Sequence, residues 1–154
     1  MTEAYTISLF GHRYIEDFVP VEEELKELVK KIIPKYETVF FLVGRDGDFD
    51  RIAASAIRRA RKEVGHQWCN LIWVIPYETA DYRDNYDEYM KYYDGIHDYD
   101  ESYRVHYKAA HKVRNRCMID ESDLVICYVG TNKGGAYDAM RYAQRTGKKV
   151  INIF

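Results

Sequence analysis

Residues 123–154, "DLVICYVGTNKGGAYDAMRYAQRTGKKVINIF", decide the fold because they contain a complete strand, loop, helix and strand. Within the predicted strand at 123–129, the apolar run from Leu124 onward is continuous, which is typical of a strand buried on both faces of a sheet. A helical pattern over 135–146 ends at Gly147, and a second apolar run at 149–154 follows it. Two buried strands joined through a helix form a βαβ unit, and this connection requires the strands to be parallel.

The same alternation of apolar runs and helical patterns extends to the N-terminus. Three more buried strands are predicted at 5–10, 38–43 and 69–75. Three more helices are predicted at 20–33, 49–63 and 102–121. We therefore predict an α/β, Rossmann-like, three-layer domain with a five-stranded, mainly parallel sheet in the order 3-2-1-4-5.

The length and composition indicate one domain, residues 1–154, that buries its own core. No apolar run approaches the roughly 20 residues of a membrane helix, so no membrane association is expected. The first ten residues lack a basic stretch that leads into a long apolar one, so we expect a cytoplasmic protein without an export signal. The three cysteines are widely spaced among apolar neighbours and predict core residues rather than a metal site. Neither a metal nor a cofactor is implied.

Charge is distributed unevenly along the chain. Residues 78–101 hold nine acids against two basic residues, whereas the whole chain has a net charge of −2. The rest of the chain is therefore mildly basic, which favours a small anionic ligand over a long nucleic acid. We therefore do not expect a nucleic-acid partner.

The acidic segment belongs to an insertion at about 77–103 that is rich in tyrosine and aspartate. Four of its tyrosines, at positions 82, 86, 89 and 93, follow helical spacing. Rigid amphipathic tyrosines suit an interface, including that of a homo-oligomer, or a lid that stacks on a base. The alternative is a solvated insertion without a binding role.

Three loops that contain glycine follow predicted strands, and each carries a cation. The carboxyl ends of parallel strands meet at one edge of the sheet, where Rossmann-like domains bind ligands. Glycine lets the backbone approach an anion, although it also serves ordinary turns. The predicted nucleotide- and phosphate-binding residues are Gly11, His12, Arg13, Gly44, Arg45, Asp46, Gly130, Thr131, Lys133, Gly134 and Gly135.

Two further residues are candidates for a reaction. Arg114 lies near an apolar helix stripe and either pairs with an acid such as Glu121 or holds a phosphate. Asp138 falls in the first turn of a helix, where it is either a surface charge that the helix dipole stabilises or a contact to a sugar. Lys112 and Arg116 are expected on the solvated side of their helix.

The segment "RNRCMIDESDLVICYVGTNKGGAYDAMRYAQRTGKKVINI" at 114–153, with "ISLFGHR" and "VGRDGDFDRIAASAIRRA" earlier, resembles the SLOG superfamily. This superfamily groups Rossmann-like nucleotide-binding proteins, among them the Lonely Guy phosphoribohydrolases and the DNA-processing-A domain. The resemblance implies catalytic places for Arg114 and Asp138, because Arg114 precedes Met118 and Asp123 at the Lonely Guy spacing. The Pro-Gly-Gly of those enzymes is absent, and Asp138 is one methylene shorter than their glutamate.

These features lead to a prediction and two alternatives. The first is a crevice that binds a nucleotide or nucleotide-derived small molecule, as a sensor or a sequestering module. The second is an N-glycosidic hydrolase or transferase acting on nucleoside monophosphates, because the nucleoside 2-deoxyribosyltransferases share a similar C-terminal pattern. The third is a protein-interaction module that uses the Tyr/Asp-rich surface.

Overall fold

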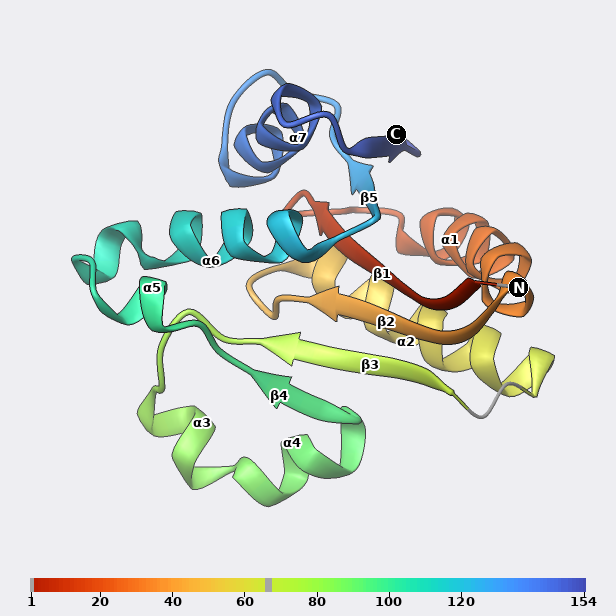
Figure 1. Cartoon of the computed structure of the whole chain (residues 1–154), viewed down its shortest axis with the longest axis horizontal. Helices are drawn as coiled ribbons and strands as arrows, with labels where there is room; N and C mark the ends of the chain where they lie inside the picture. Colours follow the sequence, from red (N-terminus) through yellow and green to blue (C-terminus); the bar gives the residue numbers. More distant parts are fainter. Residues whose placement is uncertain (1, 66–67) are drawn as a thin grey trace.

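The computed structural model describes residues 2–65 and 68–154, with only the backbone described for residues 2 and 3. Across these ranges a six-stranded sheet runs in the order β4-β3-β2-β1-β5-β6, and each neighbouring pair is parallel (Figure 1). The strands are β1 (Thr2–Gly11), β2 (Tyr36–Val43), β3 (Cys69–Val74), β4 (Gly95–His97), β5 (Leu124–Tyr128) and β6 (Lys149–Asn152).

The parallel, Rossmann-like sheet confirms the predicted fold class, but the predicted number of five strands is wrong. The additional strand is β4, which lies inside the Tyr/Asp-rich insertion and pairs with the end of β3. Three residues are too short to show an apolar periodicity, so the sequence pattern does not reveal this strand. Without β4, the order of the remaining strands matches the predicted one.

Helices cover both faces of the sheet. Alternate residues of β1 separate two cores: Ile7 and Leu9 pack with α1 and α2, whereas Phe10 packs with α6 and α7. Among the described residues, no helix is long and apolar enough to cross a bilayer. The helices are α1 (Phe18–Ile32), the 3₁₀ turn η1 (Ile33–Lys35), α2 (Asp48–Val64), α3 (Ala80–Asp84), α4 (Tyr86–Tyr92), α5 (Asp100–Tyr103), α6 (Tyr107–Glu121) and α7 (Gly135–Arg145).

The Tyr/Asp-rich insertion folds into α3, α4, β4 and α5 at one end of the sheet (Figure 1). Its tyrosines pack around Trp73 of β3: the ring centroids of Tyr82, Tyr89 and Tyr93 lie 5.9, 4.7 and 5.5 Å from the indole. Part of the tyrosine-rich pattern is therefore explained by an internal aromatic cluster. The homo-oligomer interface stays a prediction.

Candidate functional site

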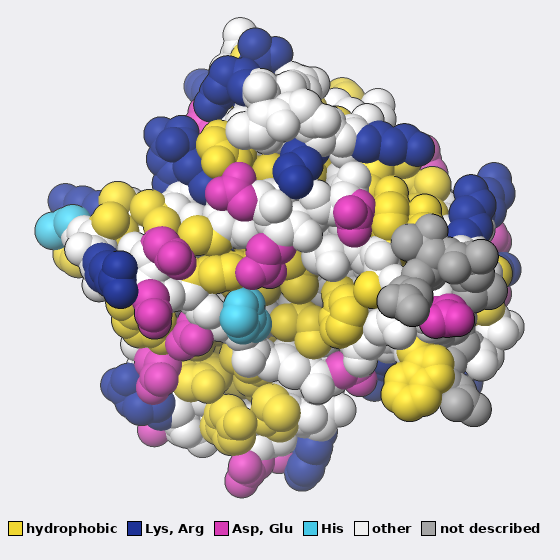
Figure 2. Space-filling model, in the orientation of Figure 1, with side chains coloured by type: hydrophobic (Ala, Val, Ile, Leu, Met, Phe, Trp, Pro, Cys, Tyr) yellow, Lys and Arg dark blue, Asp and Glu magenta, His cyan; other side chains and the backbone are white. Residues whose placement is uncertain are grey.

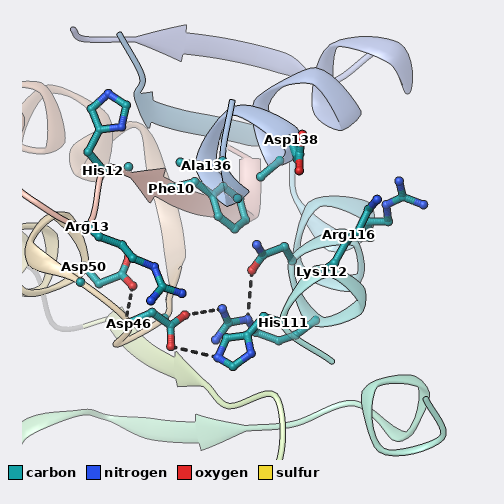
Figure 3. Close-up of a pocket in the computed structure, with 18 of the residues that line it drawn as sticks. Phe10, His12, Arg13, Asp46, Asp50, His111, Lys112, Arg116, Ala136 and Asp138 are labelled. Carbon is teal, nitrogen blue, oxygen red and sulfur yellow. Dashed lines mark hydrogen bonds and ion pairs between the residues drawn. The ribbon is translucent and has the colours of Figure 1, made fainter. Parts of the chain in front are cut away.

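A hollow of about 370 Å³ opens at the carboxyl edge of the sheet. The loops after β1, β2 and β5 line it together with α6 and the start of α7 (Figure 3). Ten of the predicted site residues line this hollow: Gly11, His12, Arg13, Gly44, Asp46, Arg114, Lys133, Gly134, Gly135 and Asp138.

Three predicted residues lie outside the lining of the hollow. The N–H of Gly130 donates to Nε2 of His12 at 2.8 Å, so Gly130 joins the β1 and β5 loops. The hydroxyl of Thr131 donates to the carbonyl of Lys133 at 3.1 Å, within its own loop. Arg45 lines a smaller neighbouring pocket, with its guanidinium carbon 4.9 Å from the centroid of the Tyr89 ring.

The loop after β1 is packed tightly onto the start of α2. A Cβ atom on Gly11 would lie 2.2 Å from Cγ of Phe49, so only glycine fits at the end of β1. The carbonyls of His12 and Arg13 accept from the N–H groups of Phe49 and Asp48, at 3.2 and 2.9 Å. The first amides of α2 are thus occupied by the protein itself and do not face an anion.

Arg114 lies beneath the hollow, with its side chain only 4% exposed. Its guanidinium donates to Oδ2 of Asp46 at 2.6 Å and to Oδ1 of Asn115 at 3.0 Å (Figure 3). It also donates to the Val74 carbonyl at 2.9 Å. The pairing acid is therefore Asp46, while Glu121 accepts from the hydroxyl of Tyr99. Each nitrogen of Arg114 already has a partner, so this arginine stabilises the floor of the site.

Two carboxyl groups of this floor have opposite environments. Burial raises the pKa of Asp46, but the hydrogen bond from His111 and the charge of Arg114 outweigh this and hold the pKa well below its usual value. Burial raises the pKa of Asp50 to about 6, although its Oδ2 accepts from the Asp46 N–H at 2.8 Å. Asp46 thus stays ionised against Arg114 while Asp50 titrates near neutral pH.

Five cations line the hollow and form no ion pair with a carboxylate within residues 2–65 and 68–154. Arg13 follows β1, and Lys133 precedes α7. The other three, Lys108, Lys112 and Arg116, are four residues apart on α6 and form one stripe. Figure 3 shows Arg13 on one side of the hollow and the α6 side chains on the other.

Lys112 is exposed, as predicted, whereas Arg116 is only partly exposed because it packs against α7. The guanidinium of Arg116 lies 4.8 Å from the centroid of the Tyr142 ring of α7, and the Tyr142 hydroxyl donates to Asp120 at 2.7 Å. This side of α6 therefore faces α7 and the hollow between the two helices. Spacing by four residues was visible in the sequence, but the position of α7 beside it was not.

Asp138 is exposed in the first turn of α7, and its backbone N–H donates to the carbonyl of Gly134 at 2.9 Å. Gly134 has a φ of 99° and a ψ of 172°, a backbone conformation that is almost restricted to glycine. The turn therefore starts α7 next to Lys133. Asp138 and Arg114 both line the hollow, but Arg114 is committed to Asp46.

Comparison with family models gives no match, and comparison with curated proteins gives none. Solved structures do resemble the chain. A DNA processing protein A from Helicobacter pylori, studied for its binding of single-stranded DNA, aligns with a TM-score of 0.63 and 18% identity. DNA processing protein A from Streptococcus pneumoniae aligns with a TM-score of 0.63 and 15% identity. Each alignment covers 95% of this chain, which spans 63% and 49% of the two neighbours.

These likenesses support the Rossmann-like fold. They contradict the prediction of a nucleotide-type small molecule as the ligand and the rating of nucleic acid as an unlikely partner. That rating rested on the acidic segment, which lies in α3, α4, β4 and α5. Figure 2 shows acidic side chains gathered over α5 and α3, whereas the lining of the hollow carries six cations against three carboxylates.

Proposed function

We propose that the protein binds single-stranded DNA along the hollow at the carboxyl edge of its sheet. The observation that carries this proposal is the set of five cations, from three separate elements, that have no carboxylate partner among the described residues. Unpaired cations along a groove are the electrostatic requirement for binding a phosphate backbone.

The stripe on α6 suits consecutive phosphates better than a single one. Lys108 and Arg116 are eight residues apart, which is about 12 Å along a helix that rises 1.5 Å per residue. Lys112 lies between them, and Lys133 and Arg13 contribute from the facing loops. A strand that runs along α6 can therefore place successive phosphates near successive cations.

Two exposed aromatic residues are direct sequence neighbours of cations that line the hollow. Tyr14 is 90% exposed and follows Arg13, while Tyr107 is 60% exposed and precedes Lys108. Unpaired bases stack on such rings, and this stacking adds affinity without demanding a sequence. In a duplex the bases are paired and stacked, and proteins recognise them with a helix or strand that projects into a groove. A concave hollow does not provide such a projecting element.

Asp138 limits where the phosphates can run. Its exposed carboxylate lies on the α7 side of the hollow and repels a phosphate at that point. We therefore place the sugars and bases, which carry no charge, beside Asp138 and the phosphates along α6. The structural likeness to DNA processing protein A supports this use of the site. We also propose that the chain is a member of the SLOG superfamily.

Fluorescence anisotropy with a labelled 20-nucleotide strand at 50 mM salt tests the proposal, with the matching duplex and a mononucleotide as competitors. We expect the single strand to bind, the duplex to compete more weakly and the mononucleotide not to compete. Repeating the titration with an RNA strand of the same sequence measures whether the protein distinguishes deoxyribose from ribose. Absence of binding to the DNA strand at 50 mM salt, or equal binding of strand and duplex, would contradict the proposal.

A further inference from the structure

A second pocket, of about 190 Å³, adjoins the hollow and shares Asp46 and His111 with it. Its other walls come from Arg45, from the end of β3 and from the start of the Tyr/Asp-rich insertion. At about 30 Å³ per water molecule, the pocket holds roughly six waters, which is room for one ring system rather than a whole nucleotide. The function proposed above does not use this pocket.

The walls of the second pocket are largely aromatic. Trp73 and Tyr82 meet edge to face with their centroids 5.9 Å apart, and Tyr77 meets His111 in the same way at 6.0 Å. Trp73 is only 8% exposed and forms the deep end, whereas Tyr77 and Tyr82 are partly exposed. Flat, apolar walls of this kind suit a planar ring that has left water.

Of the pocket's polar groups that lack a hydrogen-bond partner among the described residues, the Trp73 indole N–H only donates, whereas the Tyr77 and Tyr82 hydroxyls donate and accept. Within the described part of the chain, the Trp73 indole N–H and the hydroxyls of Tyr77 and Tyr82 form no hydrogen bond, and no buried side-chain N or O atom lacks a partner. The indole N–H therefore reaches solvent, and Trp73 lines this pocket. The two oxygens of Asp81 each accept one hydrogen bond, from Asn85 and from the Tyr89 hydroxyl.

Charge decides which part of a nucleotide can enter. The pocket contains the carboxylates of Asp46 and Asp81 and the one cation Arg45. Asp46 is paired with Arg114. The remaining charges balance, so a phosphate gains no net attraction there, whereas an uncharged base does not need one. The neighbouring hollow has an excess of cations and attracts the phosphates.

We propose that this pocket binds one unstacked base of a strand bound in the hollow. We propose further that it selects bases with a carbonyl group on the edge farthest from the sugar. This inference rests on the proposed function. Because the sugar and phosphate stay in the hollow, the base enters with the edge that is farthest from the sugar. Thymine presents the O4 acceptor there and cytosine the N4 amino donor, so donors such as Arg45 and the Trp73 N–H favour thymine.

The test compares oligo(dT) and oligo(dC) of 15 nucleotides by anisotropy at equal salt. We expect oligo(dT) to bind at least about fivefold more tightly, the lower range of discrimination for specific base contacts. Equal affinity for both oligomers overturns the inference and leaves the proposed function intact. Failure to bind either oligomer overturns both.

Two variants and a fluorescence signal test whether the preference for oligo(dT) over oligo(dC) arises in this pocket. Tyr77→Leu and Arg45→Gln should bring the ratio of the two affinities close to one while oligo(dC) still binds, whereas the control Tyr103→Leu, outside the pocket, should keep the ratio. The sequence contains two tryptophans, so in a Trp68→Phe background Trp73 is the sole indole. Oligo(dT) should quench its fluorescence, and Tyr77→Leu should abolish the quenching. Unchanged Trp73 emission on saturation with oligo(dT) places the base elsewhere.

Discussion

Replacing Lys112 and Arg116 together by alanine removes two of the five unpaired cations without disturbing the fold. Lys112 is exposed, and the guanidinium of Arg116 lies over the face of the Tyr142 ring. Alanine is the best helix former, so α6 should keep its stability. The buried neighbour Arg114 is left unchanged with its partner Asp46. The double variant therefore changes the charge of the hollow and little else.

The size of the effect follows from counterion release. Each phosphate neutralised on a single strand lowers the slope of log K against log salt by about 0.7. Five contacts give a slope of about −3.5, so affinity falls about 130-fold between 50 and 200 mM salt. With three contacts left, the slope is about −2.1 and the fall about 20-fold. At 0.1 M salt the variant should bind about 25-fold more weakly than the original chain, with the two converging near 1 M.

Anisotropy titrations of a labelled oligo(dT) at four salt concentrations measure both slopes. The matched control is Lys31→Ala with Lys35→Ala, which removes two exposed cations from the end of α1 and η1. These residues immediately precede β2, at the amino edge of the sheet, so the control should keep the original slope. A double variant in α6 whose slope equals that of the control would refute the placement of phosphates along this helix.

Three further predictions concern the architecture of the site. Gly134→Ala should lower the free energy of unfolding by about 1–3 kcal/mol because of its positive φ, whereas Gly135→Ala, with open space around it, should be neutral or stabilising; urea denaturation compares the two. Asp46→Ala should cost about 3 kcal/mol in the same assay because it leaves the buried charge of Arg114 without a carboxylate, and a loss below 1 kcal/mol would show that the pair is not buried in solution. Asp50 has its pKa raised from 3.8 to about 6, so the folded state binds more protons than the unfolded state between these values and stability falls as pH rises through them. Relative to Asp50→Asn, the original chain should lose about 2 kcal/mol between pH 4 and pH 6 and about 3 kcal/mol between pH 3 and pH 8, and parallel stability profiles would contradict this.

The sequence predicted the parallel sheet and the meeting of three loops because both depend on local patterns. Continuous apolar runs identify buried strands wherever they are long enough, which β4 is not. The pairing of Arg114 with Asp46 joins residues 68 apart in the chain, and no local pattern specifies it. Without that pairing, the sequence left open whether Arg114 pairs with an acid or holds a phosphate.

The ligand was misjudged for a related reason. Net charge along the sequence separates the acids of residues 78–101 from a mildly basic remainder, but it does not reveal that cations of this remainder gather around one hollow. The cationic stripe at Lys108, Lys112 and Arg116 follows helical spacing, but spacing alone leaves open whether such a stripe faces water or a neighbouring helix. Only the packing of α7 beside α6 turns it into the wall of a groove.

The central position of β1 has a consequence for the order in which the chain can fold during synthesis. One edge of β1 pairs with β2, whose residues follow within the first 43 positions. Its other edge pairs with β5, where Ile7 lies opposite Leu124. This second edge therefore stays unpaired until most of the chain has been synthesised. An unpaired strand edge invites pairing with another chain. A nascent chain stalled before residue 124 should therefore be prone to aggregation, and the last strands protect the first one once they dock.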